Sequence, residues 1–105
     1  MITIEIISIP DCPNHHATVE RVKSVLSSES LAMNVIETIV SNEAEARKVR
    51  FAGSPTVLVN GRDLEPFAPI STNLACRIYS NGGGVPSAAL VKSAIDRARS
   101  LGEPK

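Results

Sequence analysis

The feature that most constrains the fold is a run of β-branched residues at positions 2–9. Successive side chains of a strand point to opposite faces. Here both faces are apolar, because Ile4 and Ile6 point one way while Ile7 and Ile9 point the other. Such a strand is typical of the centre of a sheet that is covered on both sides. Pro10 ends the run, and we expect an α/β fold built around this strand.

Helical and strand patterns then alternate along the first half of the chain. Pro13 suits a first helical position, where its missing N–H costs nothing, and apolar residues at helical spacing follow it. Residues 31–40 are rich in Val and Ile and predict a second strand. Asn42 and Glu45 resemble a capping box that opens a short helix ending near Gly53. This order predicts a parallel first pair of strands.

The second half predicts two further strands and a last helix. Residues 56–59 form a third strand, and Asn60-Gly61 is a strong hairpin signal. The chain should therefore return as an antiparallel fourth strand at residues 62–64. The last helix is expected at about residues 87–101. The complete order is βαβαββα.

Composition excludes several classes of function. The 105 residues carry 11 basic and 11 acidic side chains, with no Trp and three aromatics, so neither a basic stripe nor a base-stacking platform indicates nucleic-acid binding. No apolar run approaches the length of a membrane span, and the start lacks a basic leader region. We expect one cytoplasmic domain at residues 1–105 with a loose tail at 103–105. It would be a monomer, or a homodimer formed through an exposed edge strand.

Residues whose side chains could take part in catalysis or binding gather where the first helix begins. Cys12 lies there, and a helix N-terminus stabilises a thiolate. We therefore predict a reactive thiol at Cys12 rather than an inert buried cysteine. His15, one helical turn further on, would either support that thiol as a cation or general base, or be a solvated first-turn histidine. Asp11 would cap the helix or shuttle protons.

The second cysteine lies in a long connection at residues 65–86. Loops of this length in compact domains are usually functional or disordered. Cys76 is either a partner thiol for Cys12 or a buried core cysteine beside Ile78. Arg77 is either a surface charge or the holder of an anion. Three large side chains would pack the connection against the core, namely Leu74, Ile78 and Tyr79.

The order βαβαββα with Cys12 after the first strand resembles the thioredoxin fold. The stretch Gly53-Ser54-Pro55-Thr56-Val57 is similar to the family segment that places a cis-proline before the third strand. The resemblance implies a thioredoxin-like three-layer sandwich with a four-stranded mixed sheet. It also implies that Pro55 is cis and faces Cys12, and that Pro13, Ser54 and Pro55 line the substrate site.

The motif departs from the family pattern in one place. Thioredoxins carry Cys-x-x-Cys, whereas this chain has Cys12-Pro13-Asn14-His15, so His15 stands where the resolving cysteine would be. A dithiol cycle within the motif is therefore impossible. Cys76 is the only other thiol that could resolve a mixed disulfide, provided that the loop brings it close to Cys12.

A narrower resemblance concerns Cys76. The stretch Cys76-Arg77-Ile78-Tyr79, followed by Gly84-Val85-Pro86-Ser87, is similar to the second cysteine segment of organomercurial (alkylmercury) lyases. Those enzymes hold mercury with two thiolates and use a carboxylate where this chain has His15. The resemblance does not carry over lyase activity. Independently of it, Cys12 and Cys76, with or without His15, could form a soft-metal site, because thiolates favour mercury, zinc or copper.

These observations favour a thioredoxin-like protein that uses Cys12 for thiol-redox or thiol-transfer chemistry, with His15 and Cys76 as further catalytic candidates. Its partners would be small thiols or protein disulfides, and no cofactor would be required. The alternative is binding of soft metals or organomercurials through Cys12 and Cys76. A second alternative is a non-catalytic interaction module in which the thiol is incidental.

Overall fold

The computed structural model describes residues 2–29, 33–69 and 74–101, so the predicted tail at 103–105 lies outside the described residues. The predicted order βαβαββα is confirmed. None of the helices in the described ranges is long and apolar enough to cross a membrane. The elements are β1 (Ile2–Ser8), α1 (His15–Glu29), β2 (Met33–Ile39), α2 (Glu43–Lys48), β3 (Thr56–Val59), β4 (Arg62–Asp63) and α3 (Ala88–Ser100).

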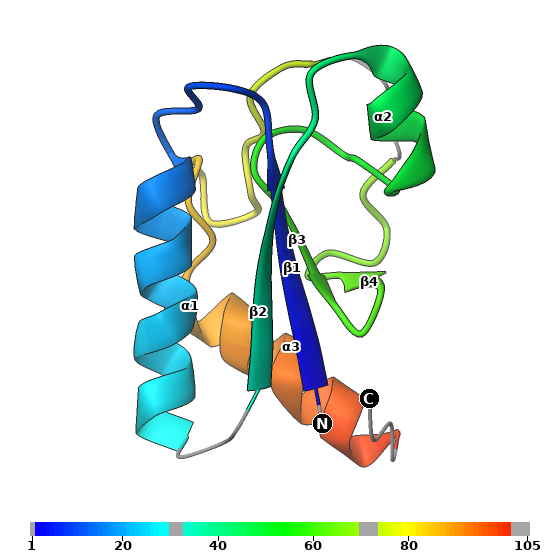
Figure 1. The fold of residues 1–105 in the computed structure, drawn as a ribbon. Coiled ribbons are helices and arrows are strands. Elements are labelled where there is room, and N and C mark those ends of the chain that lie inside the picture. Colours follow the sequence, from blue (N-terminus) through cyan, green and yellow to red (C-terminus); the bar gives the residue numbers. More distant parts are fainter. Residues whose placement is uncertain (1, 30–32, 70–73, 102–105) are drawn as a thin grey trace.

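The four strands form one mixed sheet in the order β2-β1-β3-β4. As predicted, β1 lies inside the sheet and runs parallel to β2. β3 is antiparallel to β1, and β4 returns antiparallel to β3 after the Asn60-Gly61 turn. Because β1 carries apolar groups on both faces, it gains most from a position between two strands. Figure 1 shows β1 running toward the end of the molecule where α1 begins and α2 lies.

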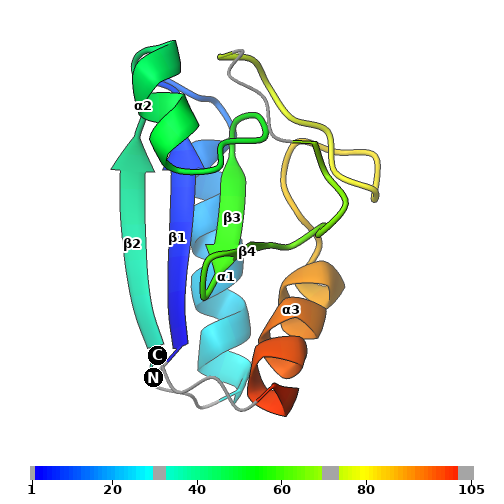
Figure 2. The same ribbon diagram turned by 90° about the vertical axis from the view of Figure 1, so that its right-hand side faces the viewer.

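Helices cover the two faces of the sheet unequally. α1 and α3 pack side by side on one face, where buried residues such as Ile4, Val22 and Ile95 form the larger core (Figures 1 and 2). The opposite face holds a smaller core around Ile7 and Phe51, near α2. Because side chains alternate along β1, one face of the strand contributes to the larger core and the other face to the smaller one.

Capping residues set the helix boundaries. One bond of the predicted capping box is confirmed: the Glu45 N–H donates to the side-chain oxygen Oδ1 of the N-cap residue Asn42 at 2.9 Å. α1 begins at His15 rather than at Pro13, because its first helical bond runs from the Thr18 N–H to the Asn14 carbonyl at 3.1 Å. Cys12 consequently lies in a turn ahead of the helix and not within its first turn.

Candidate functional site

Cys12 lies in a tight turn between β1 and α1. Its N–H donates to the Ile9 carbonyl at 3.3 Å, and its own carbonyl accepts from the His15 N–H at 3.2 Å. Asp11 turns the chain with a φ of 58°, in the left-handed region that Asp tolerates better than most residues. It therefore shapes this turn, whereas the carbonyl that opens α1 belongs to Asn14. Cys12 is half-buried and its thiol is free.

Ser54 joins the two cysteine segments. Its hydroxyl accepts the Ile9 N–H at 3.0 Å, at the beginning of the turn that holds Cys12. Its backbone N–H donates to the Ala75 carbonyl at 2.8 Å, and its carbonyl accepts the Arg77 N–H at 2.9 Å. These two bonds form an isolated parallel bridge between Ser54 and Cys76. Three segments that are distant in the sequence therefore meet at one buried serine.

The segment around Cys76 is extended, and its side chains alternate. Arg77 and Tyr79 point inward and are buried, whereas Cys76 and Ile78 point outward. The prediction that Ile78 packs against the core is wrong, since its side chain is 76% exposed. The interpretation of Cys76 as a buried core cysteine is wrong for the same reason. Pairing with Ser54 forces strand-like alternation on this segment, and alternation places these two residues outside.

Arg77 is an internal charge and not a surface one. Its side chain is 4% exposed, and it donates to both carboxylate oxygens of Asp63 at 2.6 and 2.7 Å and to Glu65 at 3.3 Å. Its guanidinium also lies 4.2 Å from the centre of the Tyr79 ring. Burial alone would lower the pKa of Arg77, but its hydrogen bonds to Asp63 raise it above its usual value. Arg77 therefore anchors the Cys76 segment to β4 as a permanent cation.

The peptide bond between Ser54 and Pro55 is cis, as the resemblance implied. Pro55 is buried, and its carbonyl accepts the Tyr79 hydroxyl at 2.6 Å. Burial raises the pKa of Tyr79, so its hydroxyl remains a donor across the pH range of ordinary experiments. Tyr79 thus ties the far end of the Cys76 segment to the residue that precedes β3.

His15 is engaged with residues other than Cys12. Its Nδ1 lies 2.6 Å from Ser8 Oγ, and its Nε2 lies 2.8 Å from Glu37 Oε1. Both ring nitrogens are therefore occupied by Ser8 and Glu37, which the sequence analysis did not single out. Glu37 could have been found from the strand register, since it pairs with Ile6 and so faces α1. The ring bridges the start of α1 to the edge strand β2.

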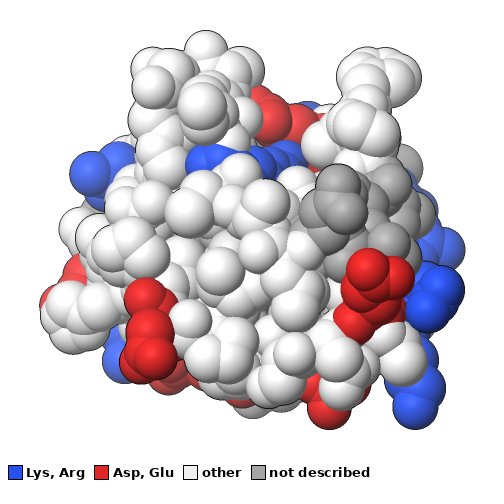
Figure 3. Space-filling view, turned by 90° about the horizontal axis from the view of Figure 1, so that it is seen from above, with Lys and Arg blue, Asp and Glu red and all other residues white. Residues whose placement is uncertain are grey.

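The glycine-rich stretch at residues 82–84 approaches Asn14, the residue before α1. A side chain at Gly84 would collide with the side chain of Asn14, two residues after Cys12. The stretch therefore approaches this turn closely. Pro13, between Cys12 and Asn14, is exposed. Figure 3 shows this end of the molecule, where uncharged side chains cover most of the middle and charged groups lie mainly at the margins.

The described residues do not assemble a site with three or more metal ligands. Within residues 2–29, 33–69 and 74–101, no group of three His, Cys, Asp or Glu side chains is placed to hold an ion. A structural zinc site needs four ligands and a catalytic one needs three. The occupied ring of His15 agrees with this finding. Cys12 and Cys76 alone would suit a metal that is satisfied by two thiolates.

The site thus offers two free thiols, one half-buried and one exposed, on segments that share hydrogen bonds with Ser54. Such thiols can attack a disulfide or bind a soft metal. Comparisons of the chain with protein-family models, with curated proteins and with solved structures give no match.

Proposed function

We propose that this protein is a thioredoxin-like thiol protein, in which Cys12 exchanges with disulfides by a monothiol route and Cys76 resolves the product. One observation carries the proposal: Ser54 is hydrogen-bonded to Ile9, in the turn that holds Cys12, and to both neighbours of Cys76. The turn that holds Cys12 and the segment that holds Cys76 are therefore both tied to one residue, Ser54, and both thiols are free.

The arrangement of the elements supports the thioredoxin-like part of the proposal. The sheet order β2-β1-β3-β4 has a parallel first pair and an antiparallel third strand. Cys12 follows β1, and Pro55 precedes β3. These are the positions at which the resemblance expects the reactive thiol and the proline that faces it.

The chemistry needs only the two thiols and an external thiol. The Cys12 thiolate attacks one sulfur of a substrate disulfide, forms a mixed disulfide and expels the other sulfur as a thiolate, which takes up a proton. The Cys76 thiolate then attacks the Cys12 sulfur and expels the second substrate thiolate. The substrate gains two electrons and two protons, while Cys12 and Cys76 become a disulfide. Two molecules of a small thiol return this disulfide to free cysteines.

Small disulfides fit the site better than protein disulfides. An extended polypeptide binds a strand edge through unpaired backbone N–H and C=O groups. At Ser54 both groups are already bonded to the Cys76 segment. A low-molecular-weight disulfide needs no such edge and requires only access to the Cys12 sulfur. We therefore assign compounds of this class as substrates.

Mass spectrometry of the intact chain tests the proposal after treatment with oxidised glutathione. The wild-type chain should lose two hydrogens and retain no adduct, because Cys76 displaces the glutathionyl group. Cys76→Ser should keep one adduct on Cys12, and Cys12→Ser should react at least tenfold more slowly than the wild type. If Cys12→Ser reacts as fast as the wild type, Cys12 is not the reactive thiol and the protein is better described as an interaction module.

Binding of a soft metal is a second candidate, favoured by the two free thiols on hydrogen-bonded segments. Thiolates prefer soft ions such as mercury or copper(I). A mercuric or organomercurial ion should bind at one per chain, and Cys76→Ser should weaken binding sharply. Equal affinity in that variant would exclude the pair as the binding site. Zinc should bind weakly, because the described residues bring no third ligand.

A further inference from the structure

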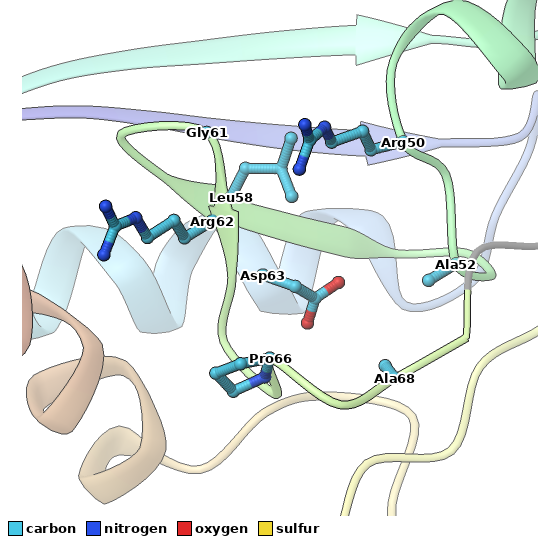
Figure 4. A pocket seen from close by; sticks show the side chains of 8 residues that line it. All are labelled: Arg50, Ala52, Leu58, Gly61, Arg62, Asp63, Pro66 and Ala68. Atoms are coloured by element: carbon cyan, nitrogen blue, oxygen red, sulfur yellow. The ribbon is translucent and has the colours of Figure 1, made fainter.

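A pocket of about 190 Å³ lies between the β3–β4 hairpin, the turn after α2 and residues 66–68. Ala52, Leu58, Pro66 and Ala68 form its apolar lining. Figure 4 shows the carboxylate of Asp63 in the midst of these side chains. Pockets for drug-sized ligands span about 300–1,000 Å³. A nucleotide or a peptide is therefore too large, whereas a molecule of amino-acid size fits.

Arg50 supplies a positive charge at the wall of the pocket. It follows α2 with a φ of 57°, and the next residue is anchored by the bond from the Phe51 N–H to the Ala46 carbonyl. Its side chain is exposed and makes no hydrogen bond or ion pair with the residues that the structure describes. A guanidinium in this state can bind a carboxylate through two parallel hydrogen bonds. Arg62 lines the same pocket.

Asp63 contributes an acceptor to the pocket. Its Oδ1 receives both the Arg77 guanidinium and the Glu65 N–H, which saturates that oxygen. Its Oδ2 receives only one donor from the described residues, the second guanidinium nitrogen of Arg77, at 2.7 Å. A carboxylate oxygen accepts about two hydrogen bonds. Oδ2 therefore has room for one donor from a ligand.

We propose that this pocket binds a free α-amino acid with an apolar side chain. Its carboxylate pairs with Arg50, its ammonium group donates to Asp63 Oδ2, and its side chain packs on Leu58 and Pro66. A simple fatty acid would leave the second acceptor position of Asp63 Oδ2 unused, and a simple amine would leave Arg50 without an anion. Neither Cys12 nor Cys76 lines this pocket, so binding here does not depend on the thiol chemistry proposed above.

Three probes that share one apolar body test the proposal: leucine, isocaproate without the ammonium group, and isoamylamine without the carboxylate. Binding is followed by NMR titration of the labelled full chain. Leucine should bind about tenfold or more tightly than either other probe, because each lacks one charge-assisted hydrogen bond. The shifted resonances should come from residues that line the pocket.

Arg50→Gln should weaken leucine binding about tenfold and leave the affinity for isoamylamine unchanged. Arg47→Gln is the matched control, because Arg47 is exposed on α2 and does not line the pocket. Ala68→Leu should abolish binding by filling the space. The proposal is overturned if leucine binds no better than the two other probes, or if Arg50→Gln and Arg47→Gln behave alike.

Discussion

The turn around Cys12 and the segment around Cys76 both present a thiol at the same end of the molecule, but they are held in different ways. The Cys12 turn has one distant partner, the Ser54 hydroxyl that accepts the Ile9 N–H, and is otherwise held by backbone bonds that span three residues, from Cys12 to Ile9 and from His15 to Cys12. The Cys76 segment is held mainly by partners 12 or more positions away. These are Ser54, Pro55, Asp63 and Glu65.

This difference indicates which thiol depends on distant contacts for its position. A local turn forms wherever its residues allow it, so Cys12 should keep its position when distant contacts are weakened. The Cys76 segment has no repeating hydrogen-bond pattern of its own. It keeps its shape only while Arg77 and Tyr79 are satisfied inside the molecule. Changes at these contacts should therefore affect Cys76 before they affect Cys12.

Arg77→Met should have the largest effect. It leaves the half-buried Asp63 without its cation, and breaking a buried pair costs about 3–5 kcal/mol. Urea unfolding should record this loss, and Arg47→Met, on the exposed face of α2, should be close to neutral. In folded Arg77→Met chains, only Cys76 should change its alkylation rate. An equal change at Cys12 would show that the two segments are not held independently.

Gly53→Ala should rank second. Gly53 has a φ of 104°, and a Cβ there would lie 2.8 Å from the Cβ of Arg77. Backbone strain and overpacking together should cost about 2–4 kcal/mol. Gly61→Ala is the matched control, since Gly61 has a φ of 83° with open space around it and should cost about 1 kcal/mol. Equal losses of unfolding free energy in the two variants would mean that the close approach of Arg77 adds nothing.

Tyr79→Phe should have a smaller effect. It removes the hydroxyl that donates to the buried Pro55 carbonyl, which should cost about 1–2 kcal/mol. The ring that stacks on Arg77 remains. Tyr79→Leu removes both contacts and should cost more. If thermal unfolding gives the same loss for both variants, the stacking of Arg77 on the ring contributes nothing measurable.

Acid should produce the smallest change, at Glu65. Burial opposes ionisation of this carboxylate, but hydrogen bonds from Ser80 and Arg77 outweigh burial and lower its pKa below the ordinary 4.5. A lowered folded pKa stabilises the fold above the ordinary value, and this contribution is lost as pH falls through the lowered value. The Ser80 amide resonance should therefore shift below about pH 4.5 and return on neutralisation. Glu65→Gln should show no such transition at Ser80.

Much of the fold could be predicted because its signals are local. Strand and helix patterns located the other elements of the described chain, and Asn60-Gly61 predicted the hairpin and with it β4. The start of α1 was predicted at Pro13 and lies at His15, because proline tolerance at a helix start does not decide which carbonyl accepts the first helical bond. Asn14 provides that carbonyl.

The site could be predicted only in part. The turn that holds Cys12 was expected from the Pro-bounded end of a strand. The exposure of Cys76 and the burial of Arg77 could not be inferred, because both depend on which strand edge the connection pairs with. The partners of His15 were missed for a similar reason, since Glu37 reaches it from a neighbouring strand.

By itself, the sequence determined the order of strands and helices, the central place of β1 and the position of Cys12 at the end of that strand. These follow from side-chain periodicity and turn residues, which act over a few positions. Only the tertiary structure decided that Cys76 faces outward, that Arg77 is an internal cation and that His15 bonds Ser8 and Glu37. Buried polar groups must find partners, and the folded sheet determines which distant groups lie within reach.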